Sequence, residues 1–250
     1  MNDDYFRTAF SLDNFPSYQC PACHSANLHK IDFLTEQTAA SKRESSEYWW
    51  QPDYEMSIYR MTLKCPKCDA IVHSHGDGII EEEYEEDPSQ GWSKIWISYL
   101  RPKNFFPPLK FIDYPIATSK GVQEALDIAS AMYYSHPAAS CNYLRIAAEG
   151  ILTSLGVPEA EPGKFVTFSS RMKSIPESSS VYGLLDALRW LGNDGSHAGT
   201  SITHLDAEDA FRVIDLLVEE VYSERKNRIH ELAAAIREHK GPIRSRGVNL

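Results

Sequence analysis

Two Cys-x-x-Cys pairs constrain the N-terminal part of the chain more than any other feature of the sequence. They are Cys20-Pro-Ala-Cys23 and Cys65-Pro-Lys-Cys68, and each has a proline directly after its first cysteine. A Cys-x-x-Cys turn presents two thiolates on one side of a tight loop, so two such turns complete a tetrahedron of sulfur ligands around zinc. The matched pairs resemble the knuckles of zinc ribbons. They predict that Cys20, Cys23, Cys65 and Cys68 bind one Zn²⁺ ion.

The ligand set also predicts the role of the metal. With cysteine at all four positions no coordination site is open for water, so the ion is expected to be structural and not catalytic. The chain has 5 cysteines, and the odd one, Cys141, argues against a secreted disulfide framework. A thioredoxin-like redox pair would need only one Cys-x-x-Cys beside a βαβ pattern, and no such pattern is apparent. Zinc is therefore the favoured interpretation.

A β-rich domain is expected around the two pairs, over residues 1–110. Apolar and polar residues alternate over 28–34, 55–63 and 94–100, which predicts strands. The acidic run over 81–87 is expected to be a solvated loop. The aromatic residues of this part are expected to fill the core of a small sheet; a platform for stacking bases is the alternative, disfavoured because no basic residues surround them. These aromatic residues are Tyr48, Trp49, Trp50, Trp92 and Trp96.

The pattern changes after a proline-rich stretch over residues 101–109, which predicts an extended linker. Residues 111–250 then show the periodicity of helices, and the last helix is expected to be long and to lead into a basic tail. The fold class is therefore predicted to be α+β, with an N-terminal zinc-ribbon-like β segment and a C-terminal all-α bundle. The expected helices run from 118 or 119, from 136 to 156, from 165 to 174, from 181 to about 191, and from 206 to about 238.

Polar residues gather around the end of the fourth of these helices. On a continuous helix Arg189, Asn193 and His197 would lie on one face. A histidine beside an asparagine and an arginine can act as a general base, while the cation stabilises a phosphate oxyanion. The alternative is a helix C-cap whose histidine bonds backbone carbonyls, and composition alone favours that alternative.

Two glycines make the end of this helix uncertain from sequence. Gly192 and Gly195 each weaken a helix by about 1 kcal/mol, so the helix is expected to end near Leu191. A second pair, Arg145 and Glu149, has the spacing of a helix-stabilising ion pair. It would bear on chemistry only if it faced the segment around His197.

These residues resemble a domain of unknown function in the HEPN superfamily, which recurs in restriction-endonuclease and phage-defence proteins, often after a Cys-x-x-Cys zinc segment. The resemblance implies a helical bundle that often dimerises. In active members it implies a polar pocket at the dimer interface that cuts RNA without a metal. The resemblance covers about residues 113–225 and is carried by Tyr114-Pro115, Glu124-Ala125, Arg145 with Glu149, Gly192-Asn193 with His197, and Asp206-Ala207 through Tyr222.

The catalytic motif of active members is an arginine, four to six residues, and then a histidine. His197 matches the histidine, and Asn193 matches a polar residue that often follows the arginine. Gly192 stands where four intervening residues would place the arginine, and on a helix the nearest arginine, Arg189, would lie about 12 Å along the axis from His197. The resemblance therefore implies a defence-associated module with a degenerate catalytic motif, which binds a nucleic acid or a partner protein and forms a homodimer through the helical domain.

Two other functions stay open. One is a metal-independent RNase in which His197 is the base and Arg189 and Asn193 contact phosphate, supported by Arg145 and Glu149. The other is a zinc-ribbon adaptor in transcription. The net charge of −10 means that the long-range field does not attract RNA, so any RNA contact has to be local.

The sequence also predicts a location in the cell. No stretch approaches the roughly 20 apolar residues that span a bilayer. The acidic N-terminus lacks the apolar region of a signal peptide. A cytoplasmic protein with no membrane partner is expected.

Overall fold

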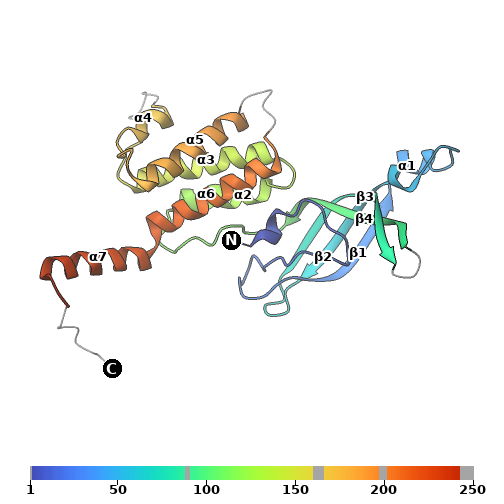
Figure 1. Cartoon of the computed structure of the whole chain (residues 1–250), viewed down its shortest axis with the longest axis horizontal. Coiled ribbons are helices and arrows are strands. Elements are labelled where there is room, and N and C mark those ends of the chain that lie inside the picture. Colours follow the sequence, from blue (N-terminus) through green and yellow to red (C-terminus); the bar gives the residue numbers. More distant parts are fainter. Residues whose placement is uncertain (1, 88–90, 160–165, 197–201, 243–250) are drawn as a thin grey trace.

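The computed structural model describes residues 2–87, 91–159, 166–196 and 202–242. An antiparallel sheet occupies one end of the molecule and a helical bundle the other, as Figure 1 shows. The α+β class is therefore confirmed. The division of the chain into domains at residue 110 stays a prediction. Within the described residues, no helix combines the length and the apolar character that a membrane span requires.

The sheet has the strand order β1-β2-β3-β4, and every neighbouring pair is antiparallel. All the expected strand segments lie in it, but two neighbouring expectations were wrong. The acidic run over 81–87 is part of β3, and residues 101–106 of the expected linker are part of β4. Each acidic residue pairs across the ladder with a residue of β4, so backbone bonds and cross-strand contacts hold a segment whose composition suggests a loop. The strands are β1 (His29–Gln37), β2 (Met56–Lys64), β3 (Ile71–Asp87) and β4 (Gly91–Phe106).

The expectation that the aromatic residues fill a core was wrong for three of them. The side chains of Tyr48, Trp49 and Trp92 are 98%, 45% and 69% exposed. The core of this half is built from other residues, which include alternate side chains of β2. Its fully buried members include Tyr18, Met61, Leu63 and Val72.

Most helices of the bundle begin and end close to the residues that the sequence predicts. Pro137 opens one helix, and Gly156, with φ of +82°, follows the end of that helix. Two expectations were wrong. The helix with Gly192 continues to Ser196, and the long last helix is broken at Ser223, whose ψ of 107° is extended. The bundle helices are α2 (Lys120–Met132), α3 (Pro137–Ser154), α4 (Phe168–Met172), α5 (Ser180–Ser196), α6 (His204–Tyr222) and α7 (Glu224–His239), and the shorter elements before β4 are η1 (Asp3–Phe6), α1 (Ala39–Glu44) and η2 (Pro52–Tyr54).

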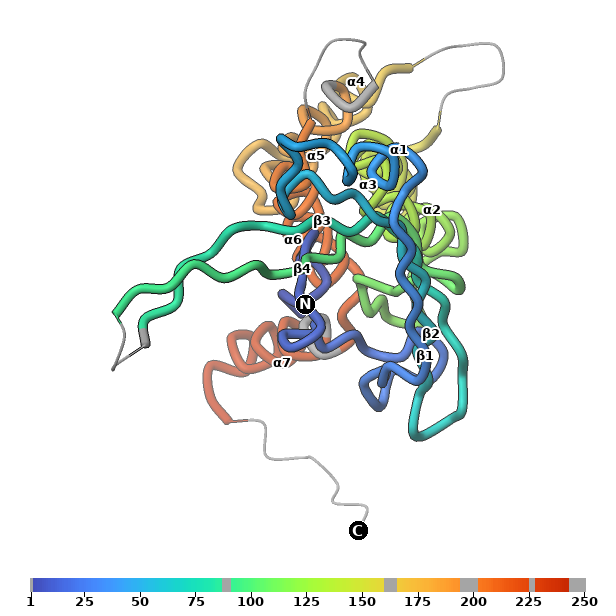
Figure 2. Tube along the Cα trace, turned by 90° about the vertical axis from the view of Figure 1, so that its right-hand side faces the viewer, coloured from blue at the N-terminus to red at the C-terminus, as the bar shows by residue number. Residues whose placement is uncertain are grey.

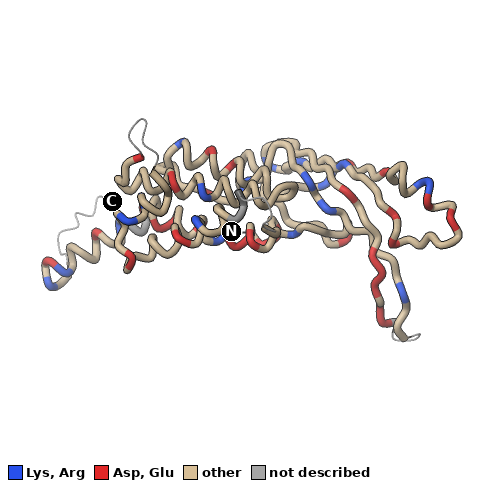
Figure 3. The backbone as a smooth tube through the Cα atoms, turned by 90° about the horizontal axis from the view of Figure 1, so that it is seen from above, with Lys and Arg blue, Asp and Glu red and all other residues tan. Residues whose placement is uncertain are grey.

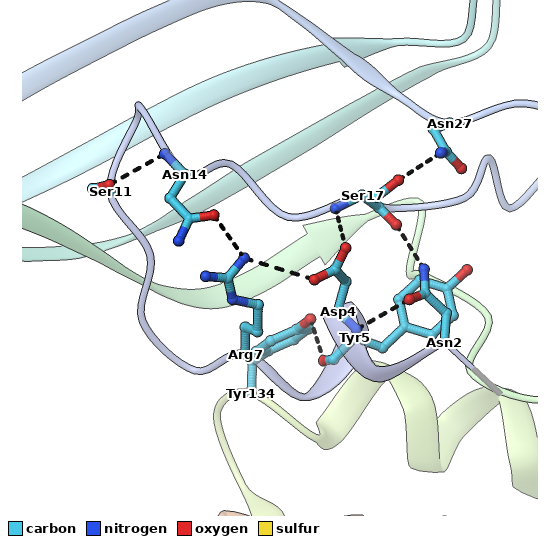
Figure 4. A network of polar contacts seen from close by, with 9 residues as sticks. All are labelled: Asn2, Asp4, Tyr5, Arg7, Ser11, Asn14, Ser17, Asn27 and Tyr134. Carbon is cyan, nitrogen blue, oxygen red and sulfur yellow. Dashed lines mark hydrogen bonds and ion pairs between the residues drawn. The ribbon is translucent and has the colours of Figure 1, made fainter.

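A cluster of aromatic rings joins the first residues of the chain to the bundle. Phe6 of η1 packs against Phe111, Tyr133 and Phe211, with ring centroids 5.6, 5.5 and 6.0 Å away. Figure 4 shows the polar contacts beside this cluster, in which the Asp4 carboxylate accepts from the Ser17 backbone N–H at 2.7 Å. The N-terminal segment therefore packs on the helices through Phe6, and it pairs with β4 through the bridge between Phe10 and Leu100.

One hydrogen bond in this cluster gives a direct test. The buried hydroxyl of Tyr134 donates to the carbonyl of Tyr5 at 2.7 Å (Figure 4). Tyr134→Phe leaves that carbonyl buried without this donor, so the free energy of unfolding should fall by about 1–2 kcal/mol in urea denaturation. Tyr133→Phe is the matched control, because its hydroxyl lies 3.4 Å and 3.5 Å from two carbonyls and should contribute less. Equal losses in the two variants would contradict this assignment.

Candidate functional site

The two Cys-x-x-Cys pairs lie in two equivalent turns at one end of the sheet, where β2 ends and β1 and β3 begin. In the first, the N–H of Cys20 bonds Ala26 O at 2.9 Å and the N–H of His24 bonds Cys20 O at 3.0 Å. In the second, the corresponding bonds run from Cys65 to Ala70 at 2.9 Å and from Asp69 to Cys65 at 3.1 Å. His24 and Asp69 both have positive φ, of 50° and 59°. The shared backbone path explains why the two pairs have the same spacing.

The four sulfur atoms lie within 4.8 Å of one another and form a group that could hold a metal ion. The Cys20–Cys68 and Cys23–Cys65 sulfur pairs are both 3.6 Å apart, and all four cysteines are free of disulfides. A tetrahedron with metal–sulfur bonds of about 2.3 Å has edges of roughly 3.8 Å, so the spacing fits such a site. Cys20 and Cys65 are buried, and Cys68 is exposed.

The acidity of the thiols also favours a cation here. The backbone N–H of Ser25 lowers the pKa of Cys23 to about 6, which favours the thiolate form of this residue. The N–H of Ala70 favours the Cys68 thiolate, but partial desolvation of the sulfur and the neighbouring cysteines raise the pKa of Cys68 to about 12. Several thiolates can share this volume only when a positive ion compensates their repulsion.

A second group of predicted residues lines one cavity of about 330 Å³ in the bundle. Arg145 and Glu149 come from α3, and Arg189 and Asn193 come from α5. Because α5 continues past Gly192, Arg189 and Asn193 stay on one helix face and reach the same cavity. His197 lies outside the described residues. The catalytic and supporting roles of these residues stay predictions.

Arg145 reaches this cavity because Gly192 has no side chain. A Cβ built on Gly192 would lie 2.4 Å from the Cβ of Arg145 and 2.7 Å from its Cδ, so the arginine stem crosses α5 at this position. Nη1 of Arg145 then lies 3.4 Å from Oδ1 of Asn193 and 3.3 Å from the Glu149 carboxylate. The buried Nε has no hydrogen-bond partner among the described residues. Gly192 therefore positions a cation that comes from another helix.

Arg189 is held more completely than Arg145. Its Nε and Nη2 donate to the Asp186 carboxylate at 2.9 and 2.7 Å, and its Nη1 donates to the Ser169 hydroxyl at 3.2 Å. The guanidinium also stacks 4.3 Å from the ring centroid of Trp190. The (i, i+3) spacing could have indicated Asp186, but Ser169 has no such signal, since it lies on α4.

Comparison with protein families gives two matches, in separate parts of the chain. A family model described as a domain of unknown function (DUF8608) matches residues 8–106. Another, also described as a domain of unknown function (DUF4145), matches residues 127–239. The first range contains all four cysteines of the cluster, and the second contains every residue that lines the bundle cavity. No curated protein and no solved structure matches the chain.

Proposed function

We propose that the chain is a zinc-stabilised, HEPN-like RNA-binding protein of a defence system, and that RNA phosphate binds in the cavity between α3, α4 and α5. The zinc assignment is supported by the all-sulfur ligand set and its spacing, because soft thiolate ligands in a tetrahedron suit zinc. A closed set of four cysteines leaves the ion a structural role. RNA recognition then falls to the helical domain.

The observation that carries the RNA proposal is the convergence of Arg145 and Arg189 on one polar cavity. Planar guanidinium groups match phosphate oxygens with two parallel donors. Arg189 is locked by Asp186 and Ser169, so it offers a fixed cation. Both contacts of Arg145 described above use Nη1, which leaves this arginine able to exchange its Glu149 contact for a phosphate. The two arginines would contact the phosphate at short range, so the site does not depend on the long-range field of a chain whose net charge is −10.

RNA binding should respond to these arginines more than to others. Arg145→Gln and Arg189→Gln keep part of the aliphatic stem but remove the charge, and each should weaken binding of a labelled single-stranded RNA about tenfold in fluorescence anisotropy. Each should also reduce the magnitude of the slope of log Kd against log salt concentration by about 1, the value expected for the loss of one phosphate contact. Arg212→Gln is the matched control, since Arg212 is an exposed, paired arginine of α6. Equal loss in all three variants would exclude a specific site.

A second candidate, metal-independent RNA cleavage, is favoured by one observation. The motif lacks an arginine at Gly192, but the Arg145 side chain lies over that glycine. A cation is thus supplied near the position where active HEPN members have their arginine. Cleavage of RNA in EDTA by the zinc-retaining protein, and its loss in His197→Ala, would support this candidate. No cleavage, or equal cleavage by both proteins, would remove it and leave binding alone.

A further inference from the structure

The outer halves of β3 and β4 form a two-stranded ribbon that extends beyond the other strands. The β2 ladder on β3 ends at the Met56–Ile79 pair, whereas the β4 ladder continues to the Asp87–Gly91 pair. Figure 2 shows this ribbon leading away from the rest of the chain. A two-stranded ribbon is marginally stable and adds little to a core. Its side chains are therefore available for contacts outside the chain.

One face of the ribbon carries aromatic and acidic side chains in alternation. Directly paired residues share a face, so Glu82 lies beside Trp96, Tyr84 beside Lys94, and Glu86 beside Trp92. Tyr84 and Trp92 are 62% and 69% exposed. We call these six residues the aromatic face: Glu82, Tyr84, Glu86, Trp92, Lys94 and Trp96.

The aromatic face continues into a groove on the same side of the sheet. The groove has a volume of about 210 Å³, and the glycine in its floor keeps it open, since a Cβ on Gly78 would lie 2.4 Å from the Ser57 hydroxyl. Leu12 of the N-terminal segment lines this groove, two residues after the bridge between Phe10 and Leu100 of β4. The lining includes Leu12, Phe33, Ser57, Gly78, Ile80 and Ser98. An extended segment has room to lie along groove and ribbon together.

The aromatic face already holds one cation, which shows the chemistry it recognises. The ammonium of Lys94 lies 4.4 Å from the Trp96 ring centroid and 2.6 Å from the Glu82 carboxylate. The Glu82 hydrogen bond raises the pKa of Lys94. Trp92 and Glu86 repeat the same tryptophan–glutamate combination two pairs further out on this face, and no lysine of the ribbon remains for them. Residues 81–87 contain six acidic side chains, and Figure 3 shows their concentration along this strand.

We propose that the aromatic face and its groove bind a Lys/Arg-rich extended segment of a partner protein. A guanidinium or ammonium of that segment stacks on Trp92 and bonds the Glu86 carboxylate, as Lys94 does with Trp96 and Glu82. Nucleic acid fits poorly, because base stacking on aromatic rings is combined with basic and not acidic surroundings in such sites. A positively charged peptide is the occupant whose charge complements this surface.

The test uses a labelled decaarginine peptide as the probe, with the intact protein at moderate salt. Trp92→Ala keeps every charge, lies on an exposed position and should weaken peptide binding about tenfold by anisotropy. The double variant Glu82→Gln/Glu86→Gln should weaken it at least as much. The matched control is Glu231→Gln/Glu238→Gln on α7, which has the same net charge and should bind almost as the unaltered protein does.

Five outcomes would overturn the proposal. Undetectable binding of the peptide by the unaltered protein is the first. Unchanged binding by Trp92→Ala, or an equal loss in the α7 control, would show only general attraction to an acidic protein. Loss of RNA binding in Trp92→Ala would assign the face to nucleic acid. Self-association that Trp92→Ala abolishes in sedimentation would assign it to a second copy of the chain. Circular dichroism of each variant shows that the sheet is retained.

Discussion

Replacing Cys65 with serine is expected to abolish binding of the proposed zinc ion and to unfold the sheet-containing half of the chain. Cys65 is fully buried, and the core around it includes Leu63, Val72 and Cys20. In small zinc sites the free energy of metal binding is folding free energy, on the order of 10 kcal/mol in isolated zinc-finger peptides. A chain that loses one of four ligands therefore loses several kcal/mol of stability in this half. This is the largest effect that we expect from any single substitution.

Metal content by elemental analysis and thermal unfolding by circular dichroism check this expectation together. Cys141→Ala is the control, because Cys141 is buried in α3 outside the metal group and its pKa is raised to about 12 by burial. It should retain the zinc and lose only about 1–2 kcal/mol of stability, as for a small buried side chain. Retention of zinc by Cys65→Ser, or an unchanged melting temperature, would contradict a four-cysteine structural site.

The second large effect is expected when a methyl group is added at Gly192. The new Cβ would meet the Arg145 stem at 2.4 Å, so α3 and α5 must separate or Arg145 must leave its position. Overpacking of this kind costs about 1–3 kcal/mol, and alanine's better helix propensity returns only about 1 kcal/mol of it. RNA affinity should fall together with stability, because the displaced residue is the cation of the proposed site.

Gly183 provides a control on the same helix. A Cβ there meets no atom within 4 Å, so Gly183→Ala should raise the free energy of unfolding by about 0.5–1 kcal/mol in urea denaturation and leave RNA binding unchanged. The two alanine substitutions thus have opposite expected signs in one helix. If Gly192→Ala is as stable as Gly183→Ala, the close approach of Arg145 to α5 is wrong.

Local signals in the sequence were sufficient for several features of the fold. The repeated Cys-Pro-x-Cys pattern located the metal group, because the geometry of each turn is set within a few residues. Pro137 and Gly156 marked the ends of α3 for the same reason. The acidic run could not be recognised as a strand, because its pairing partner is β4 and only the ladder reveals it.

The candidate cavity depends on contacts between distant parts of the chain. Sequence reasoning treated Gly192 as a helix breaker and as the position of a missing arginine. In the structure it is a contact point for Arg145, and α5 continues through it. The residues next to Gly192 in the sequence do not indicate which side chain will pack against it. The contact with Arg145 could therefore be recognised only from the tertiary structure. The break at Ser223 likewise lacks a proline or glycine to announce it.

The aromatic cluster around Phe6 has a consequence for biosynthesis. Phe6 packs on Phe211, so the Phe6 side chain can reach its final packing only after α6 has been translated. At 5–20 residues per second the ribosome needs on the order of 10 s or more to add the intervening chain. During that time the Phe6 ring lacks its contact with Phe211, so part of its apolar surface stays uncovered. A tag fused ahead of Asn2 would lie close in sequence to Phe6, whose contact with Phe211 can form only late in translation.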